Sequence, residues 1–140
     1  MSFTPIQASR LTGCSASQIR YWAETGLVTP SGVPGGYDFR DLVALRMVRS
    51  LLDAGLPLQR IRRAVQYLQD AGDDLAGLRL VTDGSSVLAC RSDGEVLDAV
   101  RRGQLALFVA VGPLAEEIEA GVARFAEERD AFLDALHASS

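Results

Sequence analysis

The sequence predicts a mainly helical protein, α+β overall, in which a winged helix-turn-helix head precedes a small antiparallel β segment and one long C-terminal helix. Three observations predict this order. Two capping-box motifs lie eleven residues apart near the N-terminus, three short apolar runs follow residue 77, and one apolar stripe occupies the last helical stretch. With 140 residues, the chain is long enough for one domain of ordinary size or for two small ones.

The two capping boxes predict the first two helices. Thr4 and Ser15 can each serve as an N-cap, and each is followed three residues later by a glutamine that can return the hydrogen bond. Gly13 can adopt the left-handed conformation that ends the first helix at about Thr12. Two short helices joined by a tight turn that contains glycine form a helix-turn-helix. We expect its shared core to contain Ile6, Leu11, Ile19 and Trp22.

The rest of the first half predicts a wing and two more helices. Residues 27–29 are apolar enough for a short strand, and residues 30–36 are dense in glycine and proline, which predicts a loop or a wing. Asp38 can cap a third helix from residue 39 to about 54, and a fourth is predicted from about residue 57 to 72. Apolar residues recur in both helices at spacings of three and four, so each helix has one buried face.

The second half predicts a small sheet and a final helix. Three segments are predicted as strands, residues 78–82, 87–91 and 105–111, with a helical turn at 95–102. Whether the third strand lines a pocket or only fills a core stays open. Gly112 and Pro113 start a helix that runs to about residue 137, roughly 35 Å long. The predicted division is residues 1–71 for the head, 72–112 for a β-rich module and 113–140 for the last helix.

The charge of the chain is divided between its two halves. The net charge is −4, but residues 1–71 carry +3 and residues 72–140 carry −7. A positive head joined to an acidic body is typical of a DNA-binding protein whose body is held away from the phosphates. No apolar run is long enough to span a bilayer and the N-terminus lacks a basic segment followed by an apolar one, so we expect a cytoplasmic protein without a membrane partner.

The last helix carries one apolar stripe that needs a partner. Acidic residues mark its opposite, solvated face. The stripe can pack on the protein's own sheet or form the seam of a homodimer, and we favour the dimer because the small preceding module has little surface to cover it. The predicted dimerisation residues are Leu114, Ile118, Val122, Phe125, Phe132 and Leu136.

The first half resembles the head of the MerR family. The likeness covers about residues 3 to 71 and rests on five segments in matching order and spacing: LTGCS at 11–15, IRYWAETGL at 19–27, GGY at 35–37, DL at 41–42 and AGLPLQRI at 54–61. It implies a winged helix-turn-helix, two further helices and a long helix that pairs antiparallel with its dimer mate. The implied function is a transcription regulator that binds an inverted repeat in double-stranded DNA as a homodimer, with RNA polymerase at the promoter as a further candidate partner.

The resemblance also points to individual DNA contacts. Ser15, Ser17 and Gln18 lie at the start of the second helix, and glutamine can bond an adenine edge in two places. The alternative for Gln18 is a purely capping role. Arg20 and Tyr21 match family positions that bind phosphate, the alternatives being a solvated arginine and a half-buried tyrosine.

The wing departs from the family pattern. Family wings usually carry arginine, whereas Asp38 is the only charged residue from 27 to 39. Wing contacts would come from the backbone amides of Gly35 and Gly36 and from the Tyr37 hydroxyl, with Arg40 compensating from the next helix and Arg10 as a further phosphate candidate. The β-rich module is absent from the simplest members and suggests a place for a small-molecule effector or a protein partner.

Other function classes fare less well. Catalysis would need a Cys-His or Ser-His-Asp arrangement or a phosphate-loop lysine, and none has support in the sequence, so we expect no enzyme. Cys14 and Cys90 are too few and too far apart to predict a metal site, and no cofactor is expected. The alternative function is an antitoxin-like or adaptor protein that binds its own operator and masks a protein partner through its C-terminal region.

Overall fold

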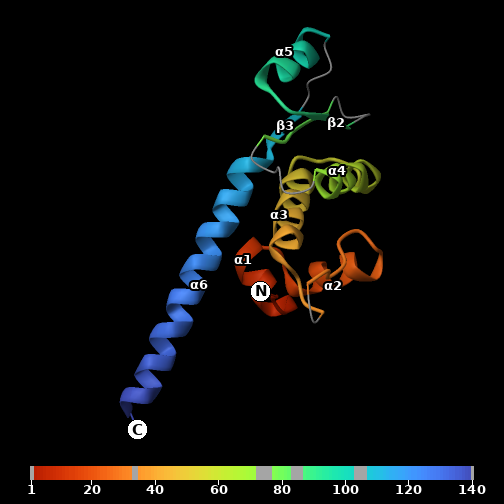
Figure 1. Cartoon of the computed structure of the whole chain (residues 1–140). Helices are drawn as coiled ribbons and strands as arrows, with labels where there is room; N and C mark the ends of the chain where they lie inside the picture. The colour runs from red at the N-terminus through yellow and green to blue at the C-terminus, as the bar shows by residue number, and fades with distance from the viewer. Residues whose placement is uncertain (1, 33–34, 72–76, 83–86, 103–106, 140) are drawn as a thin grey trace.

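The computed structural model of the chain describes residues 2–32, 35–71, 77–82, 87–102 and 107–139 (Figure 1). Its elements, in order, are α1 (Pro5–Thr12), α2 (Ala16–Glu24), α3 (Phe39–Asp53), α4 (Leu58–Asp70), β1 (Arg79–Thr82), β2 (Val87–Cys90), α5 (Asp93–Arg101), β3 (Leu107–Ala110) and α6 (Val111–Ser139). The predicted fold class is therefore confirmed: the chain is mainly helical, with one small antiparallel sheet and a long C-terminal helix.

The head is built around α3. Asp38 caps this helix and Asp41 returns the hydrogen bond, so α3 starts where the sequence predicts. Helices α1 and α4 pack on it directly, and α1 also packs on α2. Apolar residues therefore line α3 on more than one side, and its fully buried side chains include Leu42, Leu45 and Val48.

The sheet lies between α4 and α5. Its strand order is β2-β1-β3 with both pairings antiparallel, so that Leu80 faces Ala89 on one side and Val109 on the other. Because side chains alternate along a strand, Leu80 joins the main core while Val81 packs with Cys90 and Ala99 of a second cluster that includes α5. Val109 also packs against the main core, which supports a core-filling role for this strand.

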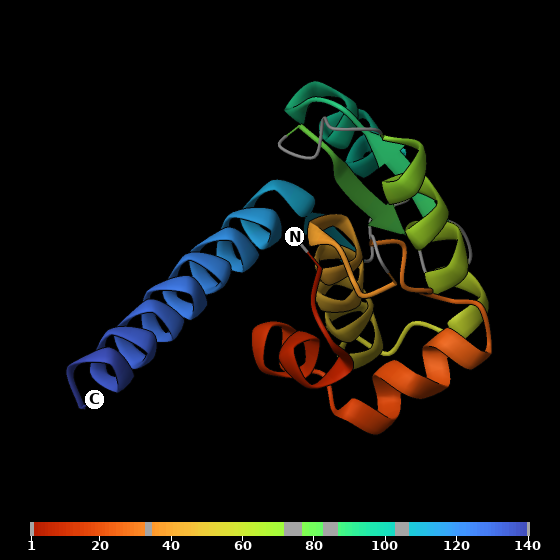
Figure 2. The same cartoon turned by 60° about the horizontal axis from the view of Figure 1, so that its bottom comes forward.

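Helix α6 leaves the body of the protein. It follows β3 without a connecting residue and crosses α3 and α1 with its first half. Its second half projects beyond the other elements, as both views show (Figures 1 and 2). Within the described ranges, no helix is both long and apolar enough to cross a membrane.

Three local predictions were wrong. Residues 27–29 do not form a strand, because the amides of Leu27 and Val28 both donate to the Trp22 carbonyl oxygen (2.9 and 3.3 Å) and wind the chain back over the end of α2. The last strand ends at Ala110, and Val111 already belongs to α6. Ile6 is 71% exposed and not in the core, because α1 turns Ala8 and Thr12 inward instead. Residues 33–34 of the predicted wing and residues 105–106 of the predicted third strand lie outside the described residues.

Candidate nucleic-acid interface

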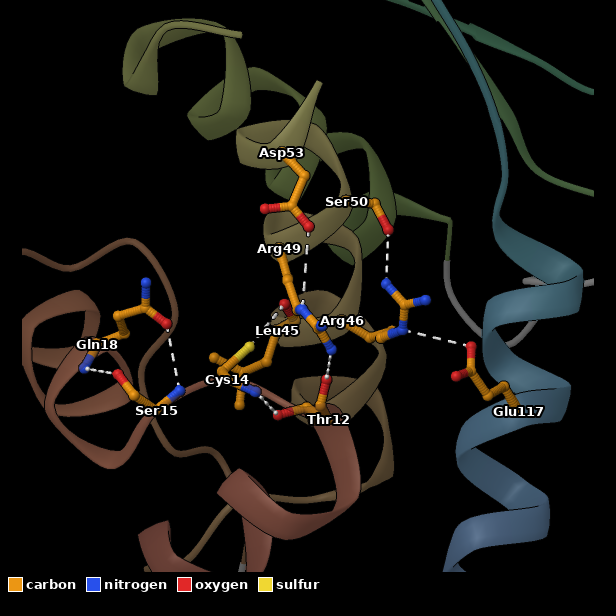
Figure 3. A network of polar contacts seen from close by, with 10 residues as sticks. All are labelled: Thr12, Cys14, Ser15, Gln18, Leu45, Arg46, Arg49, Ser50, Asp53 and Glu117. Atoms are coloured by element: carbon orange, nitrogen blue, oxygen red, sulfur yellow. Dashed lines mark hydrogen bonds and ion pairs between the residues drawn. The ribbon is translucent and has the colours of Figure 1, made fainter. Parts of the chain in front are cut away.

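The turn between α1 and α2 is held by an arginine of α3. Gly13 adopts φ 78° at the end of α1, and its amide donates to the Ser9 carbonyl oxygen (2.9 Å). A Cβ atom at this position would overlap the guanidinium of Arg49, which donates to the Thr12 carbonyl oxygen (3.4 Å; Figure 3). The left-handed backbone at this position favours glycine, whereas a Cβ atom would displace only the flexible end of the Arg49 side chain. The sequence indicated the left-handed backbone but not the arginine beside it.

Helix α2 presents a continuous polar surface to solvent. Its capping box at Ser15 fixes the first turn, and the buried side chains of Ile19 and Trp22 anchor the helix on the head. At about 3.6 residues per turn, the opposite side carries Ser17, Gln18, Arg20 and Tyr21. All four are exposed, and the Tyr21 side chain retains 55% of its accessible surface. We call these four residues the exposed α2 surface.

Gln18 already has a partner within the helix start. Its Oε1 atom accepts from the Ser15 amide (3.2 Å) and its own amide donates to the Ser15 hydroxyl (3.1 Å; Figure 3). The capping role predicted for Gln18 is thus present in the free protein. The side-chain NH₂ group takes no part in this box, so a base contact through that group remains a prediction.

Arg62 adds a cation beside the end of α2 that sequence reasoning missed. This exposed α4 residue donates from Nη2 to the Thr25 carbonyl oxygen (3.2 Å), directly after the last turn of α2. The only signal in the sequence was the Arg-Arg pair at 62–63 within a helical stretch. Nothing local indicated which of the two faces the helix-turn-helix.

The predicted wing is a loop fastened to the N-terminus. Phe3 and Tyr37 form an isolated antiparallel bridge, with both amide-to-carbonyl hydrogen bonds at 2.8 Å. Tyr37 is 3% exposed, and burial raises the pKa of its hydroxyl. Its side chain fills the core, which corrects the expectation of a hydroxyl open to DNA. A Cβ atom on Gly36 would lie 2.7 Å from the Phe3 carbonyl oxygen, so this glycine serves the bridge, and Gly35 is left as the exposed wing position.

A buried carboxylate ties the wing loop to α3. Asp41 is 6% exposed and accepts hydrogen bonds from the Ser31 amide (2.8 Å), the Ser31 hydroxyl (2.7 Å) and the Asp38 amide (3.0 Å). Burial raises the pKa of Asp41, and the hydrogen bonds from Ser31 and Asp38 offset part of that effect. Asp41 appeared in the sequence only as part of a family-like dipeptide, without a role.

The other two predicted phosphate-binding arginines have partners inside the protein. Arg10 lies 3.6 Å from the Glu128 carboxylate, and both side chains are largely exposed, so this ion pair is weak. Arg40 donates to the Leu68 carbonyl oxygen at the end of α4 (3.1 Å). In the free protein, Arg10 therefore contacts α6 and Arg40 contacts α4.

Polar contacts also connect the head to the long helix. Arg46 of α3 donates to the Ser50 hydroxyl (2.6 Å) and lies 3.3 Å from the Glu117 carboxylate of α6 (Figure 3). Closer to the wing loop, the rings of Phe3 and Phe125 meet edge to face at 6.2 Å. These contacts fix the direction in which α6 leaves the head.

The predicted dimerisation stripe divides into two parts. The first four residues, Leu114, Ile118, Val122 and Phe125, pack against the core of the same chain. Phe132 and Leu136 are 63% and 50% exposed, and Leu133 beside them is also exposed. We call Phe132, Leu133 and Leu136 the distal apolar patch. The sequence pattern was continuous, and only the length of the body shows where the covered part ends.

Both cysteine thiols are buried and have low reactivity in this fold. The Cys14 thiol donates to the Leu45 carbonyl oxygen (3.4 Å), and burial raises the pKa of both Cys14 and Cys90, which keeps them protonated near neutral pH. Across the described part of the chain, no group of three or more His, Cys, Asp and Glu side chains is placed to hold a metal ion.

Comparison with known proteins identifies the head. The model of the MerR HTH family of regulatory proteins matches residues 3–68. Uncharacterized HTH-type transcriptional regulators of Mycobacterium bovis and of two Mycobacterium tuberculosis strains are each 38% identical over 130 residues. These alignments cover 87% of this chain but 58% of each relative, so the chain spans little more than half of their length. Residues 3–68 therefore match the MerR HTH family of regulatory proteins, and the chain as a whole is similar to HTH-type transcriptional regulators.

Proposed function

We propose that the chain is a DNA-binding transcription regulator of the MerR type, which binds an inverted repeat in double-stranded DNA as a homodimer, with one α2 helix in the major groove of each half-site. The observation that carries the proposal is the exposed α2 surface, which the buried Ile19 and Trp22 hold in a fixed orientation. A helix in the major groove reads base edges with its first residues and reaches phosphates with its flanks.

Each residue of the exposed α2 surface then has a role. Ser17 and the free NH₂ group of Gln18 face base edges, while Arg20 and Tyr21 bind phosphates. Arg62 joins them at the other end of α2, where it adds a cation without disturbing the helix. The backbone amide of Gly35, an exposed residue, provides the wing contact. This division assigns sequence recognition to the start of α2 and affinity to its arginine and tyrosine.

The distal apolar patch supports the dimer. Isolated exposed apolar residues are common, but three within five residues on a projecting helix favour a second helix as partner. We propose that residues 1–71 form the DNA-binding head, residues 72–112 a regulatory module, and residues 113–140 the dimerisation helix. We also propose that the protein acts on promoter DNA in the cytoplasm. RNA polymerase is then a further partner.

Arg20→Ala tests the placement of α2. If Arg20 neutralises a phosphate, its loss weakens binding to operator and random duplexes alike, and the slope of log K against log salt falls by about one per head. The operator is selected from a random duplex pool by the wild-type protein. Arg101→Ala, which removes an exposed arginine from the end of α5, is the matched control and leaves both slopes unchanged. Wild-type affinity of Arg20→Ala at every salt concentration contradicts the proposed orientation.

A further inference from the structure

A cleft lies between α4 and the outer strand of the sheet. Its volume is about 390 Å³, within the range of about 300–1,000 Å³ that small-molecule sites occupy. One wall belongs to the DNA-binding head and the other to the β-rich module, because the lining residues are Gln59, Arg60, Arg63 and Tyr67 of α4 and Val87 and Leu88 of β2. A ligand here would touch both parts of the chain.

The α4 wall carries two arginines, and no acidic residue is among the described residues that line the cleft. Arg60 and Arg63 are three residues apart and so lie on one side of the helix, where like charges repel each other. Elsewhere in the protein, arginines such as Arg46 and Arg79 have acidic partners at 3.3 and 2.9 Å. In the described residues, neither the Arg60 nor the Arg63 side chain has such a partner, and none of the six lining residues is acidic.

The β2 wall is apolar. Leu88 is 38% exposed even though it lies in a strand, and the neighbouring Val87 packs into the main core. Tyr67 is half-buried against the same core and brings an aromatic ring to the cleft. An occupant that satisfies both walls therefore needs an anionic group at one end and an apolar body at the other.

The position of the cleft argues against a DNA phosphate as the occupant. On α4, Arg62 is the residue that contacts the end of α2. At 100° per residue, Arg60 lies about 160° and Arg63 about 100° around the helix from Arg62, and both line the cleft beside β2. A phosphate backbone would also leave the apolar wall formed by Leu88 without a partner.

We propose that the α4–β2 cleft binds a small organic carboxylate that carries an aromatic or aliphatic body. The guanidinium groups of Arg60 and Arg63 hold the carboxylate, since their planar arrays of N–H donors match its two oxygens. Tyr67 and Leu88 enclose the apolar body. Binding at this site does not depend on the DNA-binding proposal, and it can be measured without DNA.

The test uses the full chain, labelled with ¹⁵N, and three probes. Benzoate represents the proposed class, benzamide is its neutral isostere, and inorganic phosphate is a compact anion without an apolar body. Benzoate is expected to shift the amide resonances of Arg60, Arg63 and Leu88 saturably, and to bind at least tenfold more tightly than benzamide or phosphate. Absence of saturable shifts at these residues, or equal binding of benzamide, overturns the proposal. Phosphate binding as tight as benzoate overturns the role of the apolar wall.

Variants localise the effect. The double variant Arg60→Gln/Arg63→Gln keeps helix-forming residues and should lose benzoate binding at least tenfold, whereas Arg101→Gln should keep it. Leu88→Asp, at an exposed strand position, should also lose binding. This variant tests the site if the double variant fails to fold. If the folded double variant instead binds random duplex DNA more weakly and with a lower salt slope in the absence of benzoate, the two arginines are phosphate contacts and the ligand site is overturned.

Discussion

Helices α3 and α6 carry the same kind of apolar repeat but have different surroundings. Apolar residues at spacings of three and four mark both helices. Helix α3 is enclosed by other elements of the head, so Leu45 and Met47 are both fully buried. Helix α6 has 29 residues and is covered only along its first half. The comparison teaches that a periodic stripe indicates a need for a partner, while the surrounding fold decides whether that partner is in the same chain.

The largest effect is expected when a buried side chain of α3 is shortened. Leu45→Ala removes a fully buried side chain from the centre of the head and should lower the free energy of unfolding by about 2–5 kcal/mol. Urea unfolding followed by circular dichroism measures the loss. Leu97→Ala, at an exposed position of α5, is the matched control and should change stability by less than about 0.5 kcal/mol. Equal losses for the two variants would contradict the burial of α3.

The next prediction concerns the uncovered part of α6. Leu136→Asp places a charge in the proposed dry seam and should convert the dimer to a monomer, as measured by light scattering. The far-ultraviolet circular dichroism of the variant should equal that of the wild type, because the helix itself stays folded. Ala138→Asp is two residues further along and about 200° around the helix, so it should remain dimeric. A Leu136→Asp variant that is still a dimer shows that the chains associate elsewhere.

A smaller effect is expected at Asp41 in the first turn of α3, which is buried, whereas Glu116 in α6 is exposed. Asp41→Asn places an NH₂ group among the donors of Ser31 and Asp38 and should lower the free energy of unfolding by about 1–3 kcal/mol at pH 7. The exposed Glu116→Gln in the first turns of α6 should have no measurable effect.

The pH dependence of the same variant has a defined sign. Because the pKa of Asp41 is raised in the folded protein, its protonation contributes stability that is fully present below the ordinary pKa of about 3.9 and is lost as the pH rises through the raised value. The stability of wild type relative to Asp41→Asn should therefore fall as the pH increases across this window and then level off. A difference that grows with pH across the window would mean that the carboxylate is stabilised by its surroundings and not penalised by burial.

The smallest effect separates the two roles of Gln18 in α2. Loss of its half of the capping box through Gln18→Ala should cost about 1 kcal/mol of stability, measured as a lower melting temperature. If its NH₂ group also reads a base, affinity for the operator falls by roughly 1 to 3 kcal/mol while affinity for a scrambled duplex and the salt slope stay the same. A loss shared by both duplexes would assign Gln18 to capping alone.

Features that depend on neighbouring residues were predictable from the sequence. The capping boxes at Thr4, Ser15 and Asp38 join residues three apart, and the helices begin where these motifs place them. The exposed α2 surface was also predictable, because the helical repeat decides which residues of α2 share a face. The strands of the sheet were also predicted in order, because their apolar runs are separated by turn-forming residues.

Features that depend on distant contacts were not. Tyr37 looked like a wing contact because it follows two glycines, but its partner Phe3 is 34 positions away in the sequence and draws it into the core. Ile6 looked like a core residue because it is large and apolar, yet Ala8 occupies the inward side of α1. Arg49 over Gly13 and Arg62 at the end of α2 are likewise pairings that no spacing rule relates.

Strand β3 and helix α6 are joined without a connecting residue, so the sheet and the long helix are directly coupled. Ala110 ends the strand, Val111 starts the helix, and the Val111 amide also donates to the Leu78 carbonyl oxygen next to β1 (3.0 Å). Because no loop separates the two elements, a rotation of the sheet is transmitted to α6, a helix about 43 Å long, and to the parts of α3 and α1 against which the first half of α6 packs.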